Sequence, residues 1–372
     1  MKHKLKFFIL TFLFITSYAC AQNLPLDKIH LPPGFKISIY AHVPDARQMA
    51  LGPDGVVFVG TRTQGKVFAL LPNETMTLAK KIISIGNEFN YPNGVAFKDG
   101  NLYVGEIDRI IEYKNIMQQL DAKPKSIIIN KQLPNKRWHG YRYIKFGPDN
   151  WLYVGIGMPC NTCNYRNSNP KFGTIMRMRE DGKDLQIYAK GIRNTMGFAW
   201  QPQTKVLWFS DNGQDWMGDN LPPDEINRAP KTGMDFGFPF FYGDNITAPD
   251  YVNKNISKQG MTPPAWQLPA HVAALGVAFY TGKMFPAKYK DALFLAEHGS
   301  WNRSKKIGYQ VVAVDIKEGK VIAVKPFAYG WLQGENVWGR PVDVLVMPDG
   351  ALLVSDDHAG VIYRISYQQN QG

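Results

Sequence analysis

Short apolar runs of five or six residues recur along the chain, and each follows a turn dipeptide. The runs VVFVG, NLYVG, WLYVG, KVLWFS, ALFLA and ALLVS are aromatic or aliphatic and predict buried β-strands. The dipeptides before them are Asp54-Gly55, Asp99-Gly100, Asp149-Asn150, Gln203-Thr204, Lys290-Asp291 and Asp349-Gly350. A second strand-like stretch precedes most of these turns, as GVAFK does before Asp99. The pattern therefore predicts a series of six β-hairpins.

The spacing of the turns indicates how the hairpins are organised. Successive turns are 45, 50, 54, 87 and 59 residues apart, and four of these intervals are close to the length of one four-stranded propeller blade. The long interval contains residues 233 to about 270, which we expect to form an inserted loop over one face. Helical periodicity is scarce, and residues 114–121 are the best candidate. We therefore predict an all-β fold, a single six-bladed β-propeller over residues 22–372, rather than two β-sandwiches.

The N-terminal segment has the composition of an export signal. Three lysines within the first six residues precede a short apolar stretch at residues 7–15. This stretch is shorter than the roughly 20 residues of a membrane span. We expect residues 1–21 to be a signal peptide that is cleaved after Ala21, or Cys20 to carry a lipid anchor. Both endings predict an exported protein, either periplasmic or tethered to a bacterial membrane.

Charge and cysteine content exclude some functions. The net charge is +12, and the chain stays basic without its signal segment. Lysines and arginines are scattered singly, so the sequence favours anionic small ligands and predicts no nucleic-acid partner. Cys160 and Cys163 are the remaining cysteines, and in an oxidising compartment we expect a local disulfide. A zinc site would need a second pair of ligands, and a thioredoxin-like motif would need a helix where Pro159 and Asn164 indicate a loop.

Carboxylates follow the second strand of four hairpins. They are Glu106, Asp211, Glu297 and the pair Asp356-Asp357, with His298 and His358 beside two of them. If the strands occupy equivalent positions in their blades, the residues after them share one face around the axis. The pattern then predicts a polar mouth that holds a small ligand. The alternative is that each carboxylate caps a turn.

His139 precedes the strand-like stretch YIKFG, so its loop is expected near the same mouth. The unperturbed pKa of histidine suits a general base near neutral pH. A structural role for a single histidine is the alternative.

Six motifs occur in a characteristic order between about residues 31 and 366. They are His139 followed by FGPDNWLYVGIG, GIRNTMGFAW at 191–200, SDNGQDWMGDNLPPDEINR at 210–228, FGFP at 236–239, AEHGSWNR at 296–303 and GRPVDVLVMPDG at 339–350. Together they resemble the soluble sugar dehydrogenases that use pyrroloquinoline quinone (PQQ), the glucose and sorbosone dehydrogenase family. CNTC at 160–163 makes the sorbosone-type branch the better match. The resemblance implies oxidation of a sugar at its anomeric carbon by hydride transfer to PQQ, with an external electron acceptor.

The resemblance also implies roles for individual residues. His139 would take the proton of the sugar hydroxyl. Arg193 and Asn194 would bind the cofactor near its reactive carbonyls, and Arg193 would stabilise the negative charge that develops on reduction. Further cofactor contacts are expected from Arg303, Arg340 and His298, with Lys305 or Lys306 as alternatives to Arg303.

A calcium ion is the second expected cofactor. The resemblance places it in the loop that begins at Asp211, with backbone carbonyls among its ligands. The candidate ligands are Asp211, Gly213, Gln214 and Asp224, and Asp215, Asp219 and Glu225 lie close enough in sequence to add oxygens. Hard oxygen ligands suit calcium, which would act as a Lewis acid. Solvated loop carboxylates are the alternative.

Two other functions remain open at this point. A lactonase-type hydrolase would hold calcium with Glu106, Asn194 and Asp211. A propeller without catalysis would bind polysaccharide or protein through exposed aromatic residues. The candidates for that surface are Trp216, Phe240, Phe241, Tyr242, Trp266 and Trp301. The ordered series of motifs favours the dehydrogenase.

Overall fold

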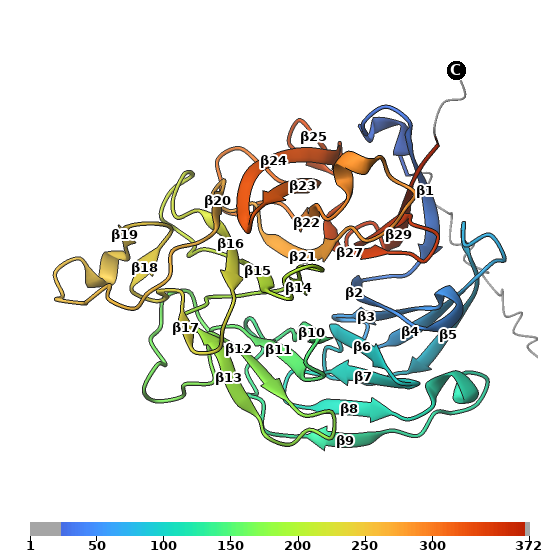
Figure 1. Cartoon of the computed structure of the whole chain (residues 1–372), viewed down its shortest axis with the longest axis horizontal. Coiled ribbons are helices and arrows are strands. Elements are labelled where there is room, and N and C mark those ends of the chain that lie inside the picture. Colours follow the sequence, from blue (N-terminus) through green and yellow to red (C-terminus); the bar gives the residue numbers. More distant parts are fainter. Residues whose placement is uncertain (1–23, 369–372) are drawn as a thin grey trace, which may run out of the picture.

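The computed structural model describes residues 24–368, which form six β-sheets around a central axis (Figure 1). Each sheet is a blade of four antiparallel strands, and the third blade gains a fifth, parallel strand. The predicted six-bladed β-propeller is confirmed. Within these residues the helices are short 3-10 turns, and none is long and apolar enough to cross a bilayer. The export segment predicted at residues 1–21 lies outside the described residues.

The strands of each blade are given from the axis outwards. Blade one contains β2 (Ala46–Leu51), β3 (Val57–Thr61), β4 (Val67–Pro72) and β5 (Ala79–Gly86). Blade two contains β6 (Gly94–Lys98), β7 (Asn101–Gly105), β8 (Ile110–Tyr113) and β9 (Ile127–Asn130). Blade three contains β10 (Ile144–Phe146), β11 (Leu152–Ile156), β12 (Thr174–Met178), β13 (Gln186–Lys190) and β17 (Met234–Asp235).

Blades four to six follow the same order. Blade four contains β14 (Phe198–Trp200), β15 (Leu207–Asp211), β16 (Asp224–Ala229) and β20 (Trp266–Leu268). Blade five contains β21 (Ala274–Phe279), β22 (Leu293–Glu297), β23 (Gln310–Lys317) and β24 (Lys320–Tyr329). Blade six contains β27 (Pro341–Val346), β28 (Leu352–Asp356), β29 (Val361–Tyr367) and β1 (Phe35–His42). The remaining elements are β18 (Phe241–Tyr242), β19 (Ile246–Thr247), β25 (Leu332–Gln333), β26 (Asn336–Val337), η1 (Leu26–Lys28), η2 (Pro53–Gly55), η3 (Ile116–Gln119), η4 (Pro249–Tyr251) and η5 (Ala287–Tyr289).

All six predicted turns join the first strand of a blade to its second strand. The turn between β6 and β7 shows why the sequence signal is strong. Asp99 and Gly100 have φ angles of 47° and 85°, and tight two-residue hairpins need such left-handed residues. In blade four, where the turn contains no glycine, Lys205 adopts the left-handed conformation.

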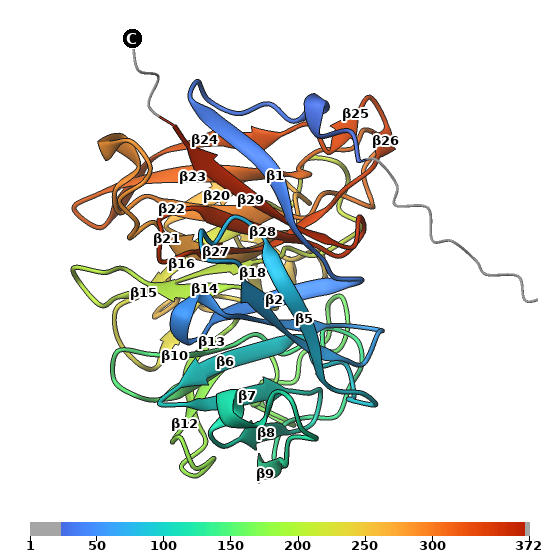
Figure 2. The same cartoon turned by 90° about the vertical axis from the view of Figure 1, so that its right-hand side faces the viewer.

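The ring is closed by a strand from the other end of the chain. β1 pairs antiparallel with β29, from Phe35 opposite Tyr367 to His42 opposite Val361. The start of the described chain thus supplies the outermost strand of blade six, and the C-terminal part supplies its three inner strands (Figure 2). This pairing ties the first and last blades together, as closure of a propeller requires.

The hydrophobic core lies between blades rather than on the axis. Six clusters of buried apolar side chains each join two neighbouring blades. One example packs Phe294 and Phe327 of blade five against Val354 and Tyr363 of blade six. Because apolar packing occupies the spaces between sheets, the loops at the ends of the axis are left to polar residues.

The long interval between turns is an excursion inside blade four. It leaves the blade after β16, adds β17 to blade three, forms the β18–β19 hairpin and returns as β20. Residues 266–268 are therefore a blade strand and not part of a loop. The hairpin projects outward beside blades three and four (Figure 1).

Candidate active site

Loops at one end of the axis enclose a cavity of about 290 Å³. Its lining is strongly basic, with four arginines and three histidines against two aspartates. The basic residues are Arg47, Arg62, Arg193, Arg340, His139, His271 and His298. Confined positive charge of this kind attracts an anionic ligand. The cavity is the candidate active site.

The mouth is polar, as expected, and His298 lines it, but the carboxylates predicted to line it lie elsewhere. Glu106 forms an ion pair with Arg109, and Glu297 accepts a hydrogen bond from Gln310 at 2.8 Å. Asp356 accepts the backbone N–H groups of His358 and Ala359. None of these three carboxylates lines the cavity, nor does Asp211. Turn capping explains Asp356, because a short acidic side chain accepts nearby backbone N–H groups, whereas Glu106 and Glu297 are held by side-chain partners.

Two arginines of the cavity were missed in the sequence. Arg62 directly follows β3, the second strand of its blade, so a comparison of all six strand ends would have found it. Arg47 lies inside β2, where the sequence carries no signal of its role. The guanidinium of Arg62 is ion-paired with Asp45 at 3.5 Å and with Asp357 at 3.9 Å.

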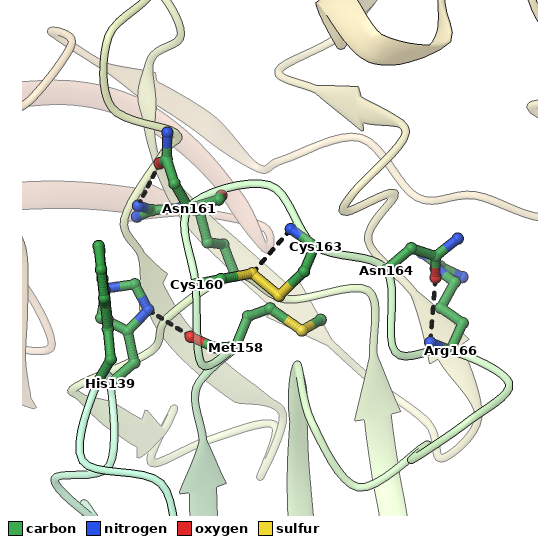
Figure 3. Close-up of a disulfide and its surroundings, with 9 residues drawn as sticks. His139, Met158, Cys160, Asn161, Cys163, Asn164 and Arg166 are labelled. Atoms are coloured by element: carbon green, nitrogen blue, oxygen red, sulfur yellow. Dashed lines mark hydrogen bonds between the residues drawn. A yellow bond between two sulfur atoms is a disulfide. The ribbon is translucent and has the colours of Figure 1, made fainter.

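His139 is held in one orientation beside the cavity (Figure 3). Its Nδ1 lies 2.7 Å from the carbonyl oxygen of Met158, and only a protonated Nδ1 can donate to that acceptor. The lone pair is therefore on Nε2, which accepts the indole N–H of Trp138 at 3.1 Å. The backbone of His139 is left-handed, with a φ of 51°. Such strain in a residue other than glycine is concentrated at functional sites.

Burial and the charge of Arg193 keep His139 neutral. Burial has the larger effect, and together they lower its pKa from 6.5 to about 3, although the hydrogen bond to Met158 opposes them. A neutral imidazole with its lone pair on Nε2 can accept a proton from a ligand in the cavity.

The CNTC segment holds Arg193, and Met158, two residues before it, holds His139. Cys160 and Cys163 form the expected disulfide (Figure 3). Within the resulting ring, Asn161 accepts two bonds from Arg193, from Nη2 to its side-chain oxygen at 2.8 Å and from Nε to its carbonyl at 3.2 Å. Arg193 also donates to Asp215 at 2.8 Å. The loop that carries Met158 and Asn161 thus positions the imidazole and the guanidinium together.

Asn194 and Arg340 also line the cavity, as the sequence led us to expect. The side-chain oxygen of Asn194 is buried without a hydrogen-bond partner in the described protein. An orphaned buried oxygen is costly unless a ligand or water satisfies it. Arg340 donates from Nε and Nη2 to the carbonyls of His298 and Gly299, at 3.0 and 2.8 Å.

His298 belongs to a charged cluster at the cavity wall. Its Nε2 lies 2.8 Å from Asp357, which also accepts from Arg47 at 2.9 Å. Burial alone would raise the pKa of Asp357, but its contacts with His298, Arg47 and Arg62 hold this pKa well below its ordinary value. Burial lowers the pKa of His298 from 6.5 to about 4, against the opposing effect of Asp357.

His298 is expected to contribute a loss of stability between pH 6.5 and pH 4. In this window the unfolded chain binds a proton on His298 and the folded chain does not, so acid favours unfolding by up to ~3 kcal/mol. The stability that ionised Asp357 contributes is lost only at pH values below this window, because the pKa of Asp357 is lower in the folded protein than in the unfolded chain. The variant His298→Gln, which can still donate to Asp357, should show a shallower loss in thermal unfolding scans. An identical pH dependence in both proteins would contradict the assignment.

Comparison with known proteins agrees with this geometry. A family model described as glucose/sorbosone dehydrogenase matches residues 105–364. The chain belongs to this family. An uncharacterized protein of Borreliella burgdorferi is 35% identical over 97% of both chains. An aldose sugar dehydrogenase of Escherichia coli is 26% identical over 51% of this chain and 46% of its own. The PQQ domain of a Coprinopsis cinerea pyranose dehydrogenase has the same fold, with a TM-score of 0.76, 17% identity and coverage of 91% of this chain and 97% of its own.

Some residues expected to bind a cofactor in this glucose/sorbosone dehydrogenase family member lie elsewhere. Arg303 does not line the cavity, because its guanidinium donates to the backbone carbonyls of Asp219 and Ala270. Lys306 donates to the carbonyl of Glu335, and neither it nor Lys305 lines the cavity. The loop after β22 therefore faces the cavity with Trp301 and Asn302 instead.

The carboxylates that we expected to bind calcium accept hydrogen bonds from loop backbone N–H groups and do not form an open set of metal ligands. Asp211 accepts the backbone N–H groups of Arg193 and Asn194, and Asp224 accepts those of Gly213 and Ala273. Burial is the main cause that raises the pKa of Asp211 to about 8 and of Asp224 to about 6.

The other two candidate calcium ligands, Gln214 and Gly213, also do not form an open cage of side-chain oxygens. The side chain of Gln214 accepts the hydroxyl of Tyr242, and Gly213 reaches the cavity through its backbone. Among residues 24–368, no group of three or more His, Cys, Asp or Glu side chains is placed to hold a metal ion. Of the hydrolase set Glu106, Asn194 and Asp211, only Asn194 lines the cavity.

Proposed function

We propose that this chain is a quinoprotein dehydrogenase that oxidises an aldose-like sugar at its anomeric carbon, with PQQ as the cofactor. The observation that carries the proposal is a cavity lined by four guanidiniums and by a neutral imidazole of fixed tautomer. Membership of the glucose/sorbosone dehydrogenase family supports it. So do the aldose sugar dehydrogenase and the PQQ domain to which the chain is similar. The sorbosone-type branch stays a prediction.

The cavity fits the charge of this cofactor. PQQ carries three carboxylates, and Arg47, Arg62 and Arg340 offer cationic donors to them at the cavity, where Arg47 and Arg62 share the carboxylate of Asp357. The buried, unpartnered oxygen of Asn194 can accept a hydrogen bond from a donor group of a ligand. When bound, the quinone supplies the acceptor for the two electrons of the oxidation.

His139 would act as the general base. The anomeric hydroxyl donates to Nε2 in place of the indole N–H of Trp138. As the C–H bond at the anomeric carbon breaks and hydride departs with its electron pair, the hydroxyl proton moves to Nε2 and the carbon becomes a carbonyl. Arg193, held by Asn161 and Asp215, keeps its charge next to the reacting atoms. Negative charge brought into the cavity offsets the field of Arg193 and raises the pKa of His139 towards neutrality.

Two elements of the proposed reaction, the calcium ion and the electron acceptor, are not provided for by side chains of the cavity. Calcium would have to rest on backbone oxygens near Asn212 and Gly213, and no step above depends on it. The electrons pass to an external acceptor, and the proposed location is the periplasm or a bacterial membrane reached through residues 1–21.

Reconstitution tests the proposal. Purified apoprotein would be mixed with PQQ, with and without calcium, and then given aldoses and an artificial dye as the electron acceptor. Dye reduction that requires both PQQ and sugar is the expected result. Absence of both PQQ binding and dye reduction would reject the function, and lactone hydrolysis without PQQ would favour a hydrolase.

The disulfide is expected to position the catalytic groups. In the double variant Cys160→Ser with Cys163→Ser, the loop that holds His139 and Arg193 loses its cross-link. We expect a loss of about 2 kcal/mol in stability from the short loop, and a fall in kcat on the order of tenfold from misplaced groups. Thermal unfolding and dye-linked kinetics of the variant and of oxidised wild type measure the two effects. A loss of stability with unchanged kcat would contradict the positioning role.

A further inference from the structure

Three tryptophans in residues 24–368 have more than half of their surface exposed. Trp138 is 57% exposed, Trp216 is 71% and Trp301 is 59%. All three lie at the mouth of the cavity. Trp301 lines it, Trp216 packs against Trp301, and the indole of Trp138 bonds His139. Large apolar side chains left in water around one cavity mark a binding surface.

The pair formed by Trp216 and Trp301 is held in place although it is exposed. The two rings are edge to face, with centroids 5.0 Å apart. Asp215, which precedes Trp216, accepts a hydrogen bond from Asn302, which follows Trp301. Trp216 also has a left-handed backbone with a φ of 71°, which is unfavourable for a bulky residue by about 1–3 kcal/mol. The loop therefore keeps Trp216 at the rim at a cost to its own backbone.

The other aromatic candidates from the sequence do not share this exposure. Phe241 and Tyr242 are buried against the blades, Phe240 packs on Tyr251, and Trp266 is partly buried against the core between blades four and five. Of the aromatic residues expected to form a binding surface, only Trp216 and Trp301 are therefore well exposed, and both lie at the cavity. An indole ring has a flat apolar face, and it suits a ligand that is apolar on one face and polar at its edge, as a pyranose ring is.

We propose that Trp216 and Trp301 bind the further units of an oligosaccharide whose reducing-end unit is oxidised in the cavity. This inference rests on the proposed sugar oxidation. Only the reducing-end unit carries a free anomeric hydroxyl, so that unit must reach His139. A cavity of about 290 Å³ that also holds a quinone leaves the next units outside, over the rim where the pair lies.

Chain-length dependence of the kinetics tests the inference. With glucose, cellobiose and cellotriose as substrates and a dye as acceptor, wild-type kcat/KM is expected to rise about 3- to 10-fold from monosaccharide to trisaccharide. Trp216→Ala should reduce the ratio of trisaccharide to glucose kcat/KM towards one, and Trp216→Phe, which keeps a ring, should restore most of it. Ile127→Ala removes an apolar side chain that is 50% exposed on β9 and is the matched control. It should leave the ratio unchanged.

A second measurement separates this inference from the proposed function. Cellotriose is titrated into protein without PQQ while the heat of binding is recorded by calorimetry. Binding in wild type that is lost in Trp216→Ala supports the sugar platform even if no sugar is oxidised. Equal chain-length ratios in wild type and Trp216→Ala overturn it. A change confined to the KM for the electron acceptor also overturns it, because the rim would then bind a redox partner.

Discussion

Replacing His139 by Gln is expected to lower kcat for sugar oxidation by about 10²- to 10⁴-fold, the usual contribution of a general base. The affinity for PQQ should be nearly unchanged, because Gln has a similar size and carries no charge, like the neutral imidazole. The fall in kcat follows from the loss of the lone pair on Nε2. In wild type the hydrogen bond from Nδ1 to Met158 orients the ring so that Nε2 faces away from the loop that carries Met158. Dye-linked kinetics and PQQ titration measure the two quantities separately.

The variant His139→Asn is the control for this result. Its side-chain amide can still donate to Met158, so the loop keeps its anchor while the base is lost. Both variants should therefore be equally inactive and as stable as wild type. Wild-type activity in either variant would remove His139 from the mechanism.

Replacing Arg193 by Ala is expected to weaken PQQ binding by about 10²- to 10³-fold. Truncating one partner of a buried hydrogen-bonded charge pair costs several kcal/mol, because the other partner stays buried and unpaired. Here the unpaired groups would be Asp215 and Asn161, which lie at the same cavity. The added negative field at Asp215 also repels a ligand with three carboxylates. Titration of PQQ into apoprotein, followed by absorbance or protein fluorescence, gives the affinity.

Arg193→Lys distinguishes charge from geometry. Lysine keeps the positive charge, but a single ammonium cannot reach Asn161, Asn212 and Asp215 at once as the guanidinium does. Its PQQ affinity should lie between those of wild type and Arg193→Ala. Circular dichroism confirms that each variant is folded. Wild-type affinity in a folded Arg193→Ala protein would contradict the role of Arg193.

The local parts of the structure could be predicted from the sequence. A hairpin such as β6–β7 is defined by residues next to each other, and Asp99 and Gly100 both adopt the left-handed conformation that its tight turn requires. The Cys160–Cys163 disulfide needs only three residues of chain to form. The positions of His139, Arg193, Asn194, His298 and Arg340 at the cavity were expected from motif order, which the family match supports.

The composition of the cavity wall depended on tertiary contacts. The carboxylates after the second strands looked like the wall itself, but Asp211 turns to N–H groups of the loop before β14. Arg303 is likewise kept from the cavity by tertiary contacts, because the backbone carbonyls that it binds, those of Asp219 and Ala270, belong to other loops. No spacing along the chain shows which acceptor lies nearest in space.

The sequence by itself determined the six hairpins, the disulfide and the family, because each depends on neighbouring residues or on their order. Only the tertiary structure decided that β1 completes the last blade, more than 300 residues away from its partner β29. It also decided that Arg47 and Arg62 join the cavity, and that Trp216 and Trp301 meet at its rim. The physical reason is the radial arrangement: residues far apart in the chain become neighbours when blades close around one axis.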